Sequence, residues 1–181
     1  MTYLISGGAK NGKSSLAQNL AVSLAAGGTH YYVATMIPVD EEDRARIRRH
    51  IADRAGLGFE TLECGKHLLS CLETADTSAT FLLDSVTALL MNELFPPEQD
   101  YQLDLAAGMR CAGELETFAK AVKNAVFVSD YIYSDAHRYD PSTESYRRML
   151  AEIDRRLARV CDTVVEVSAG QYILHKGELT L

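Results

Sequence analysis

A glycine-rich segment near the start of the chain restricts the possible folds more than any other feature. Residues 7–14 read Gly-Gly-Ala-Lys-Asn-Gly-Lys-Ser and match the pattern G-x-x-x-x-G-K-[ST] in full. In this pattern the backbone N–H groups and the lysine surround nucleotide phosphates, and the final hydroxyl binds Mg²⁺. The pattern has this meaning only between a strand and a helix, so the flanking residues decide whether the segment binds phosphate.

The residues before the glycine-rich segment predict a strand, and the residues after it predict a helix. Residues 2–6 form a short apolar run that stops at Gly7-Gly8, which is typical of a buried strand leading into a tight turn. From Ser14 onward, leucines recur at helical spacing, and Gly27-Gly28 predicts a left-handed end to that helix. Residues 30–35 read as a second strand. This order of strand, turn, helix and strand predicts a parallel sheet.

The rest of the chain continues the alternation. We expect strands at residues 59–64, 80–84, 125–129, 163–168 and 171–175, and helices at residues 40–55, 66–75, 86–94, 103–122 and 146–160. The charged helix at 40–55 should be largely exposed, and the last two strands should form a hairpin at Ala169-Gly170. The expected fold class is α/β: a single domain over residues 1–181 with the three layers of a P-loop NTPase of kinase or RecA type. Its mostly parallel sheet should carry helices on both faces and a C-terminal hairpin.

The amino-acid composition disfavours several classes of binding partner and location. Among 181 residues, 25 acidic side chains outnumber 18 basic ones, which disfavours binding to nucleic acid. No apolar stretch approaches the roughly 20 residues of a membrane span, and no leader segment is visible, so we expect a cytoplasmic protein. The cysteines are too widely spaced for a zinc site and are expected to be reduced; they are Cys64, Cys71, Cys111 and Cys161.

The glycine-rich segment also predicts chemistry. Lys13 would place its charge on the β and γ phosphates, while Ser14 and Asp84, which ends the strand at 80–84, would hold Mg²⁺. The alternatives are a plain glycine turn and, for Asp84, a cap on the helix beginning at residue 86. The candidate phosphate-binding residues are Gly7, Gly8, Ala9, Lys10, Asn11, Gly12, Lys13, Ser14 and Ser15.

The reaction is not determined by such a segment, because kinases, nucleotidyltransferases and motor ATPases all use it. The chain lacks the N-K-x-D sequence of switch GTPases, and its length favours a kinase-like phosphotransferase over a motor.

Several segments resemble those of one family, the bifunctional adenosylcobinamide kinase/adenosylcobinamide-phosphate guanylyltransferases of cobalamin biosynthesis. Residues 6–14 resemble the family's G-G-A-R-S-G-K-S loop, and residues 32–35 its Y-I-A-T strand. Residues 40–42 and 46–50 are similar to its D-x-E-M and R-I-x-x-H segments. Glu63, and the stretch from residue 83 to Asn92, are similar to its T-x-E and L-[DE]-[CS]-[LIV]-T-x-x-x-x-N elements. The similarity extends over nearly the whole chain.

This resemblance implies a P-loop kinase-like fold and two reactions, which use ATP and GTP as substrates and a corrinoid as acceptor. His50 would carry the guanylyl group, with Arg46, Arg49 and Arg54 balancing phosphate charge. The residues implied to border the nucleotide are Ala34, Thr35, Met36, Ile51, Ala52, Asp53, Arg54 and Glu63. The family assembles as a trimer, so we expect a homo-oligomer. Without the resemblance, His50 is one exposed histidine on a charged helix.

The chain departs from the family pattern at two places. It has Asp130-Tyr131-Ile132-Tyr133 where the family has N-E-V-G, and residues 148–155 do not follow the D-x-x-G-x-x-N-Q pattern. Residues 131–143 read as a functional loop, and Tyr131, Tyr133 and Tyr139 are expected at a subunit boundary or substrate cleft, or else packed within one subunit. Two alternatives remain: a P-loop kinase acting on another small molecule, and a non-catalytic nucleotide-binding regulator.

Overall fold

The computed structural model describes residues 1–179. The strands and helices alternate along the chain in the order β1 (Thr2–Gly7), α1 (Lys13–Ala25), β2 (His30–Ala34), α2 (Glu41–Asp53), β3 (Glu60–Glu63), η1 (Leu68–Glu73), β4 (Thr80–Asp84), α3 (Val86–Leu94), η2 (Pro97–Gln99), α4 (Leu105–Ala121), β5 (Asn124–Asp130), α5 (Pro141–Val160), β6 (Thr163–Ser168) and β7 (Gln171–Lys176). The helices labelled η are 3₁₀-helices.

The strands form one seven-stranded sheet in the order β3-β2-β4-β5-β1-β6-β7. All neighbouring pairs are parallel except β6 and β7, which form the expected antiparallel hairpin. Ala169 and Gly170 both have positive φ, as a two-residue hairpin turn requires. The strand β1, which leads into the phosphate loop, is central, and its direct neighbours are β5 and β6.

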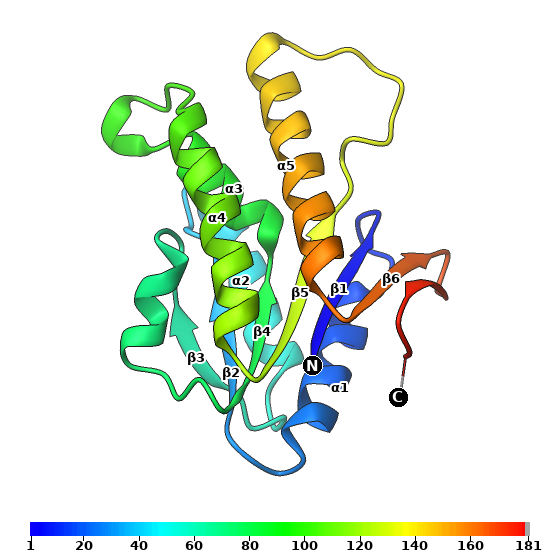
Figure 1. Cartoon of the computed structure of the whole chain (residues 1–181). Coiled ribbons are helices and arrows are strands. Elements are labelled where there is room, and N and C mark those ends of the chain that lie inside the picture. The colour runs from blue at the N-terminus through cyan, green and yellow to red at the C-terminus, as the bar shows by residue number, and fades with distance from the viewer. Residues whose placement is uncertain (180–181) are drawn as a thin grey trace.

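Helices cover both faces of the sheet (Figure 1). On one face, α1 packs Leu16 and Leu20 against apolar side chains of β1, β2, β4, β5 and β6. On the other face, α3, α4, α5 and η1 bury a larger cluster that includes Phe81, Phe118 and Phe127. Because the sheet is covered on both sides, its central strands are apolar on both faces. The fold is therefore the three-layer α/β arrangement expected from the sequence.

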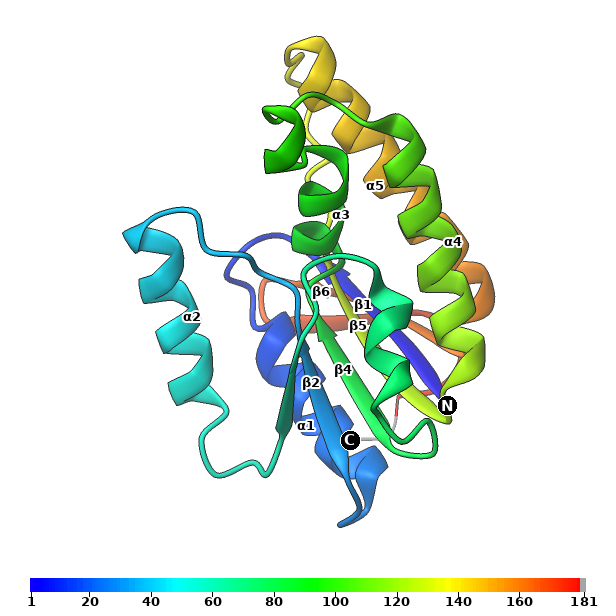
Figure 2. The same cartoon turned by 90° about the vertical axis from the view of Figure 1, so that its left-hand side faces the viewer.

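Helix α2 differs from the others. It stands away from the sheet on the side of α1 and is joined to β2 and β3 by segments without helix or strand (Figure 2). None of its residues is buried, in agreement with the charged sequence. Asp40 caps its N-terminus by accepting a hydrogen bond from the N–H of Asp43.

The expected elements are confirmed with three corrections. The helix expected at 66–75 is wrong: the segment forms the short 3₁₀-helix η1, in which Leu68 and Cys71, three residues apart, point into the core. Helix α5 begins at Pro141 instead of Tyr146, because Asp140 accepts hydrogen bonds from the N–H groups of Ser142 and Thr143. The left-handed end of α1 expected at Gly27-Gly28 lies one residue earlier: Ala26 is the C-cap with φ of 48°, and Gly27 follows with positive φ.

The four cysteines are buried and free. Within residues 1–179, no helix has both the length and the apolar character needed to cross a bilayer.

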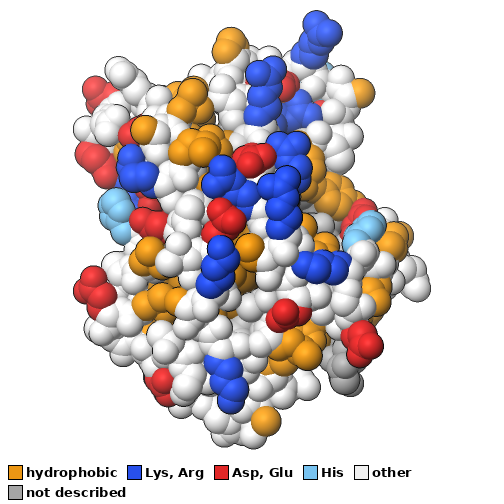
Figure 3. All heavy atoms as spheres, in the orientation of Figure 1, with side chains coloured by type: hydrophobic (Ala, Val, Ile, Leu, Met, Phe, Trp, Pro, Cys, Tyr) orange, Lys and Arg blue, Asp and Glu red, His pale blue; other side chains and the backbone are white. Residues whose placement is uncertain are grey.

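On the face formed by α4 and α5, basic side chains lie among acidic ones (Figure 3). Arg156 on α5, for example, pairs with Glu116 at 3.4 Å and with Glu152 at 3.0 Å.

Candidate active site

The phosphate loop lies between β1 and α1, as the sequence predicts. A Cβ atom on Gly7 would collide with the carbonyl oxygen of Val167 and with the Asn11 side chain, so glycine is required there. Gly12 is the N-cap of α1 with φ of 94°. Because glycine has no side chain that could cap the helix, the first turn of α1 can donate N–H groups to an anion.

Lys13 is buried and folds back over the loop. Its Nζ atom donates hydrogen bonds to the Gly8 carbonyl at 2.6 Å and to Asn11 Oδ1 at 3.3 Å. It also pairs with Asp130 Oδ1 at 2.7 Å. Asn11 is held in turn by a hydrogen bond from its Nδ2 to the carbonyl of Val167. The ammonium group is therefore fixed above the loop by three acceptors.

Asp84, at the end of β4, lies next to side chains of three other elements: Tyr32 of β2, His50 of α2 and Ser14 of α1. Its Oδ2 atom accepts a hydrogen bond from the Tyr32 hydroxyl at 3.1 Å and lies 3.9 Å from His50 Nδ1. Burial raises the pKa of Asp84, while the His50 ring and the hydroxyls of Tyr32 and Ser14 act in the opposite direction. Ser85, rather than Asp84, caps α3 by accepting a hydrogen bond from the N–H of Ala88. The carboxylate of Asp84 therefore faces the site.

A cavity of about 440 Å³ opens between the phosphate loop, the carboxyl ends of the strands and α2. Arg54 stacks on the Tyr32 ring, with its Cζ atom 4.0 Å from the ring centroid. The lining side chains come from all three regions: Ala9, Lys10, Lys13, Ser14, Tyr32, Ala34, Met36, Arg46, Ile47, Arg49, His50, Ile51, Arg54, Glu63, Asp84, Ser85, Ala88, Val128 and Asp130. The histidine and the phosphate loop, distant in sequence, thus share one cavity.

Most of the candidate residues lie at this cavity. The wall contains Ala9, Lys10, Lys13, Ser14, Ala34, Met36, His50, Ile51, Arg54, Glu63 and Asp84. Gly7, Gly8, Asn11 and Gly12 shape the loop behind the wall, and Ser15 is exposed on α1. Ala52 and Asp53 are exposed on α2 and lie outside the lining.

Thr35 is completely buried and does not line the cavity, but it forms two hydrogen bonds with Ser85 of the cavity wall. Its hydroxyl accepts from the N–H of Ser85 at 2.7 Å and donates to the Ser85 carbonyl at 2.8 Å. Asn92 donates to the carbonyls of Thr35 and Gly65, both at 2.8 Å, and thereby ties the ends of β2 and β3 to α3. Thr35 and Asn92 therefore position the cavity wall.

Several residues of the cavity wall are not among the candidates predicted from the sequence, and two of them, Tyr32 and Asp130, bond directly to Asp84 and Lys13. Tyr32 lies in the quoted strand motif but reads as an ordinary buried strand residue. Asp130 stands where the chain departs from the family pattern, and its partner Lys13 is more than a hundred positions away. The available signal for Asp130 was its position: it ends a buried strand, as Asp84 does.

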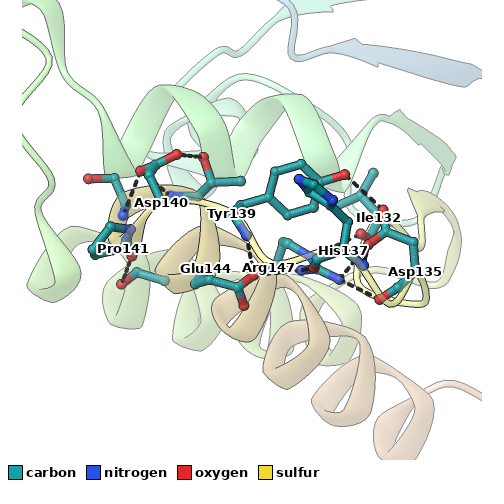
Figure 4. Close-up of polar contacts among 11 residues, drawn as sticks. Ile132, Asp135, His137, Tyr139, Asp140, Pro141, Glu144 and Arg147 are labelled. Carbon is teal, nitrogen blue, oxygen red and sulfur yellow. Dashed lines mark hydrogen bonds and ion pairs between the residues drawn. The ribbon is translucent and has the colours of Figure 1, made fainter.

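The loop after β5 is organised by Arg147, a buried residue of α5 (Figure 4). Its guanidinium donates to the carbonyls of Ile132, Asp135 and His137 at 3.0–3.1 Å. It also pairs with the carboxylates of Asp135 and Glu144. One side chain thus binds backbone carbonyls along most of the loop, which contains no helix or strand.

The three tyrosines of this loop make contacts within the chain. The Tyr133 hydroxyl donates to Asp154 at 2.8 Å, and the Tyr139 hydroxyl donates to Asp135 at 2.9 Å. Tyr139 also lies under the Arg147 guanidinium, at 4.9 Å from the ring centroid. The rings of Tyr131 and Tyr133 are 6.5 Å apart.

Relatives match nearly the full length of the chain. CobU of Salmonella typhimurium, a bifunctional adenosylcobalamin biosynthesis protein, is 27% identical; the match covers 94% of this chain and 97% of CobU. CobP of Pseudomonas aeruginosa, with the same description, is 31% identical; the match covers 98% of this chain and 99% of CobP.

Solved structures share the fold at low identity. The flagellar accessory protein FlaH of Methanocaldococcus jannaschii matches with a TM-score of 0.52 and 13% identity, covering 97% of this chain and 78% of FlaH. An ATPase domain of known structure matches with a TM-score of 0.50 and 10% identity, covering 97% of this chain and 76% of that domain. A family model matches residues 3–174, and the chain belongs to the cobinamide kinase / cobinamide phosphate guanyltransferase family.

Proposed function

We propose that this protein phosphorylates the aminopropanol hydroxyl of adenosylcobinamide with a nucleoside triphosphate and then transfers GMP from GTP onto that phosphate. The observation that carries the proposal is the shared cavity, in which His50 of α2 faces the phosphate loop. A phosphate loop alone would suit any kinase. A histidine across the same cavity adds a nucleophile for a second, nucleotidyl-transfer reaction.

In the first reaction, the loop N–H groups, the N-terminus of α1 and Lys13 would hold the triphosphate. They would stabilise negative charge on the transferred phosphoryl group, which is the main contribution that proteins make to phosphoryl transfer. ATP and GTP are the substrates that the family membership supports.

In the second reaction, a neutral His50 would attack the α phosphorus of GTP. A nitrogen–phosphorus bond forms as the bond to pyrophosphate breaks. A phosphate oxygen of the corrinoid would then attack the same phosphorus, and the histidine would leave. Arg46, Arg49 and Arg54 line the cavity and would offset the added negative charge.

The residues present fit Mg²⁺. The Ser14 hydroxyl lies beside the buried Asp84 carboxylate, so two oxygen donors of the kind that Mg²⁺ prefers lie together. Such an ion takes its remaining ligands from phosphates and water. Within residues 1–179, no three or more His, Cys, Asp or Glu side chains are grouped as a metal site of their own. When bound, Mg²⁺ would neutralise charge on the phosphates.

The same proposal includes a corrinoid acceptor, a homo-oligomer that is trimeric by resemblance to the family, and a cytoplasmic location. The family membership supports the corrinoid acceptor. The size of the corrinoid, which exceeds what a 440 Å³ cavity can enclose, supports a site shared between chains.

The test is a product assay with adenosylcobinamide, ATP and GTP labelled at the α phosphate. Wild type should form both products and an acid-labile, alkali-stable labelled adduct. His50→Ala should lose the adduct and the GMP transfer but keep phosphorylation, whereas the control His175→Ala should behave as wild type. Lys13→Ala should lower phosphorylation by about a hundredfold or more, because a phosphate clamp is removed.

The outcome also separates the alternatives. ATP turnover on another hydroxyl without any adduct would identify a different small-molecule kinase. Tight nucleotide binding with neither product would identify a regulator.

A further inference from the structure

We propose that Asp130 accepts the proton of the acceptor hydroxyl during phosphoryl transfer, an inference that rests on the proposed kinase function. Asp130 ends β5, the direct neighbour of β1, and its Cα atom lies opposite that of Gly7 in the parallel register. Its N–H donates to the Thr87 hydroxyl at 3.0 Å, which fixes the residue at the strand end. Its carboxylate lines the cavity and is one-third exposed.

The contact with Lys13 locates Asp130 relative to the reacting atoms. A lysine ammonium has three N–H donors, and those of Lys13 are directed at Gly8, Asn11 and Asp130. In this motif the lysine reaches the β and γ phosphates, so phosphate oxygens must replace at least one of these acceptors. The Asp130 carboxylate, 2.7 Å from Nζ, then lies beside the γ phosphate with lone pairs free to accept a proton.

The other carboxylates of the cavity are less suitable. Asp84 is bonded to Tyr32, faces His50 and lies beside Ser14, in the position proposed for Mg²⁺. Glu63 ends β3, which lies at the edge of the sheet and is separated from β1 by β2, β4 and β5. Asp130 alone among these three touches the lysine of the phosphate loop.

The acceptor oxygen forms a bond to the γ phosphorus while its proton moves to a carboxylate oxygen of Asp130. The bond between the γ phosphorus and the β–γ bridging oxygen breaks, and the nucleoside diphosphate leaves with that electron pair. Asp130 then releases the proton to solvent. The later GMP transfer has a phosphate oxygen as acceptor, which is already anionic and needs no base.

Asp130 should therefore matter to one of the two reactions only. The experiment compares wild type, Asp130→Asn, Asp130→Glu and the control Glu73→Gln, an exposed carboxylate of η1. For each we would measure the Kd of ATP, the rate of adenosylcobinamide phosphorylation, and GMP transfer to separately prepared adenosylcobinamide phosphate. Asp130→Asn should lower kcat for phosphorylation by about 10²–10⁴-fold while leaving the Kd of ATP and GMP transfer near wild type. Asp130→Glu, which keeps a base, should recover part of that loss.

Three results would overturn the assignment. Normal phosphorylation by Asp130→Asn would exclude a base role. Equal loss of both reactions or of ATP binding would make Asp130 a nucleotide-binding residue. Recovery of Asp130→Asn by Mn²⁺ would make it a metal ligand. If wild type itself phosphorylates no adenosylcobinamide, the proposed kinase function fails and the role of Asp130 fails with it.

Discussion

Asp154 is a carboxylate that the fold buries without giving both of its oxygens a partner. Its Oδ2 atom accepts hydrogen bonds from Ser129 at 3.1 Å and Tyr133 at 2.8 Å, whereas Oδ1 is buried without a hydrogen bond from the residues that the structure describes. Burial raises the pKa of Asp154 to about 6, although the bonds from Tyr133 and Ser129 oppose that shift. The residue links α5 to the end of β5, just before Asp130.

This predicts a pH-dependent effect on stability. The folded state holds the Asp154 proton up to about pH 6, whereas the unfolded chain releases it near the ordinary pKa of 3.8. Wild type should therefore lose stability relative to Asp154→Asn as the pH rises from about 4 to about 7, by roughly 2–3 kcal/mol. Urea denaturation across this range measures the difference. A difference that does not change with pH would contradict the prediction, and Asp100→Asn, an exposed position, is the control.

At the scale of elements, α5 holds the loop between β5 and itself through Arg147 and Asp154. The Arg147 side chain is only 8% exposed, whereas that of its partner Asp135 is 51% exposed. Removing the guanidinium therefore leaves carboxylates that can reach water, but it leaves three loop carbonyls without their donor. The loop conformation depends on this one side chain.

We predict that Arg147→Met destabilises the fold by about 1–3 kcal/mol, the range for leaving buried polar groups without a hydrogen-bond partner. The loop should open locally, so trypsin should cleave after Arg138 faster than in wild type. Arg148→Met, at the exposed neighbouring position of the same helix, should change neither property. Unchanged cleavage in Arg147→Met would show that other contacts hold the loop.

Local patterns predicted most elements because strands and helices depend on residues close in sequence. The exception is residues 66–75, which form the 3₁₀-helix η1 instead of the expected α-helix. Leu68 and Leu72 have the spacing of an α-helix, but the observed segment buries Leu68 and Cys71, the spacing of a 3₁₀-helix. The tertiary contact of His67 N–H with Glu93 on α3, at 2.7 Å, holds the start of this segment.

At the scale of the whole molecule, the edge strand β7 is left uncovered by the rest of the described chain. All six residues of β7 are exposed, and Tyr172, Ile173 and Leu174 are each nearly half exposed. An edge strand with exposed apolar side chains is open to further pairing.

We predict a homo-oligomer in solution, with a mass three times the 19.9 kDa of one chain. A ligand as wide as a corrinoid needs more concave surface than one chain of this size offers, and the resemblance to the family implies three chains. Light scattering at micromolar concentration measures the mass directly. A mass of one chain under these conditions would rule the assembly out.

The sequence by itself determined the phosphate loop, its strand and helix, the hairpin and the α/β class, because each depends on residues a few positions apart. It also marked His50 and Asp84, through their motifs. Only the tertiary structure decided that β5 lies between β1 and β4, which brings Asp130 beside Gly7 and Lys13. Strand order follows from how helices and strands pack on both faces of a sheet, and no short-range pattern encodes it. For the same reason, the contacts that Arg147 makes with the loop were decided by the fold.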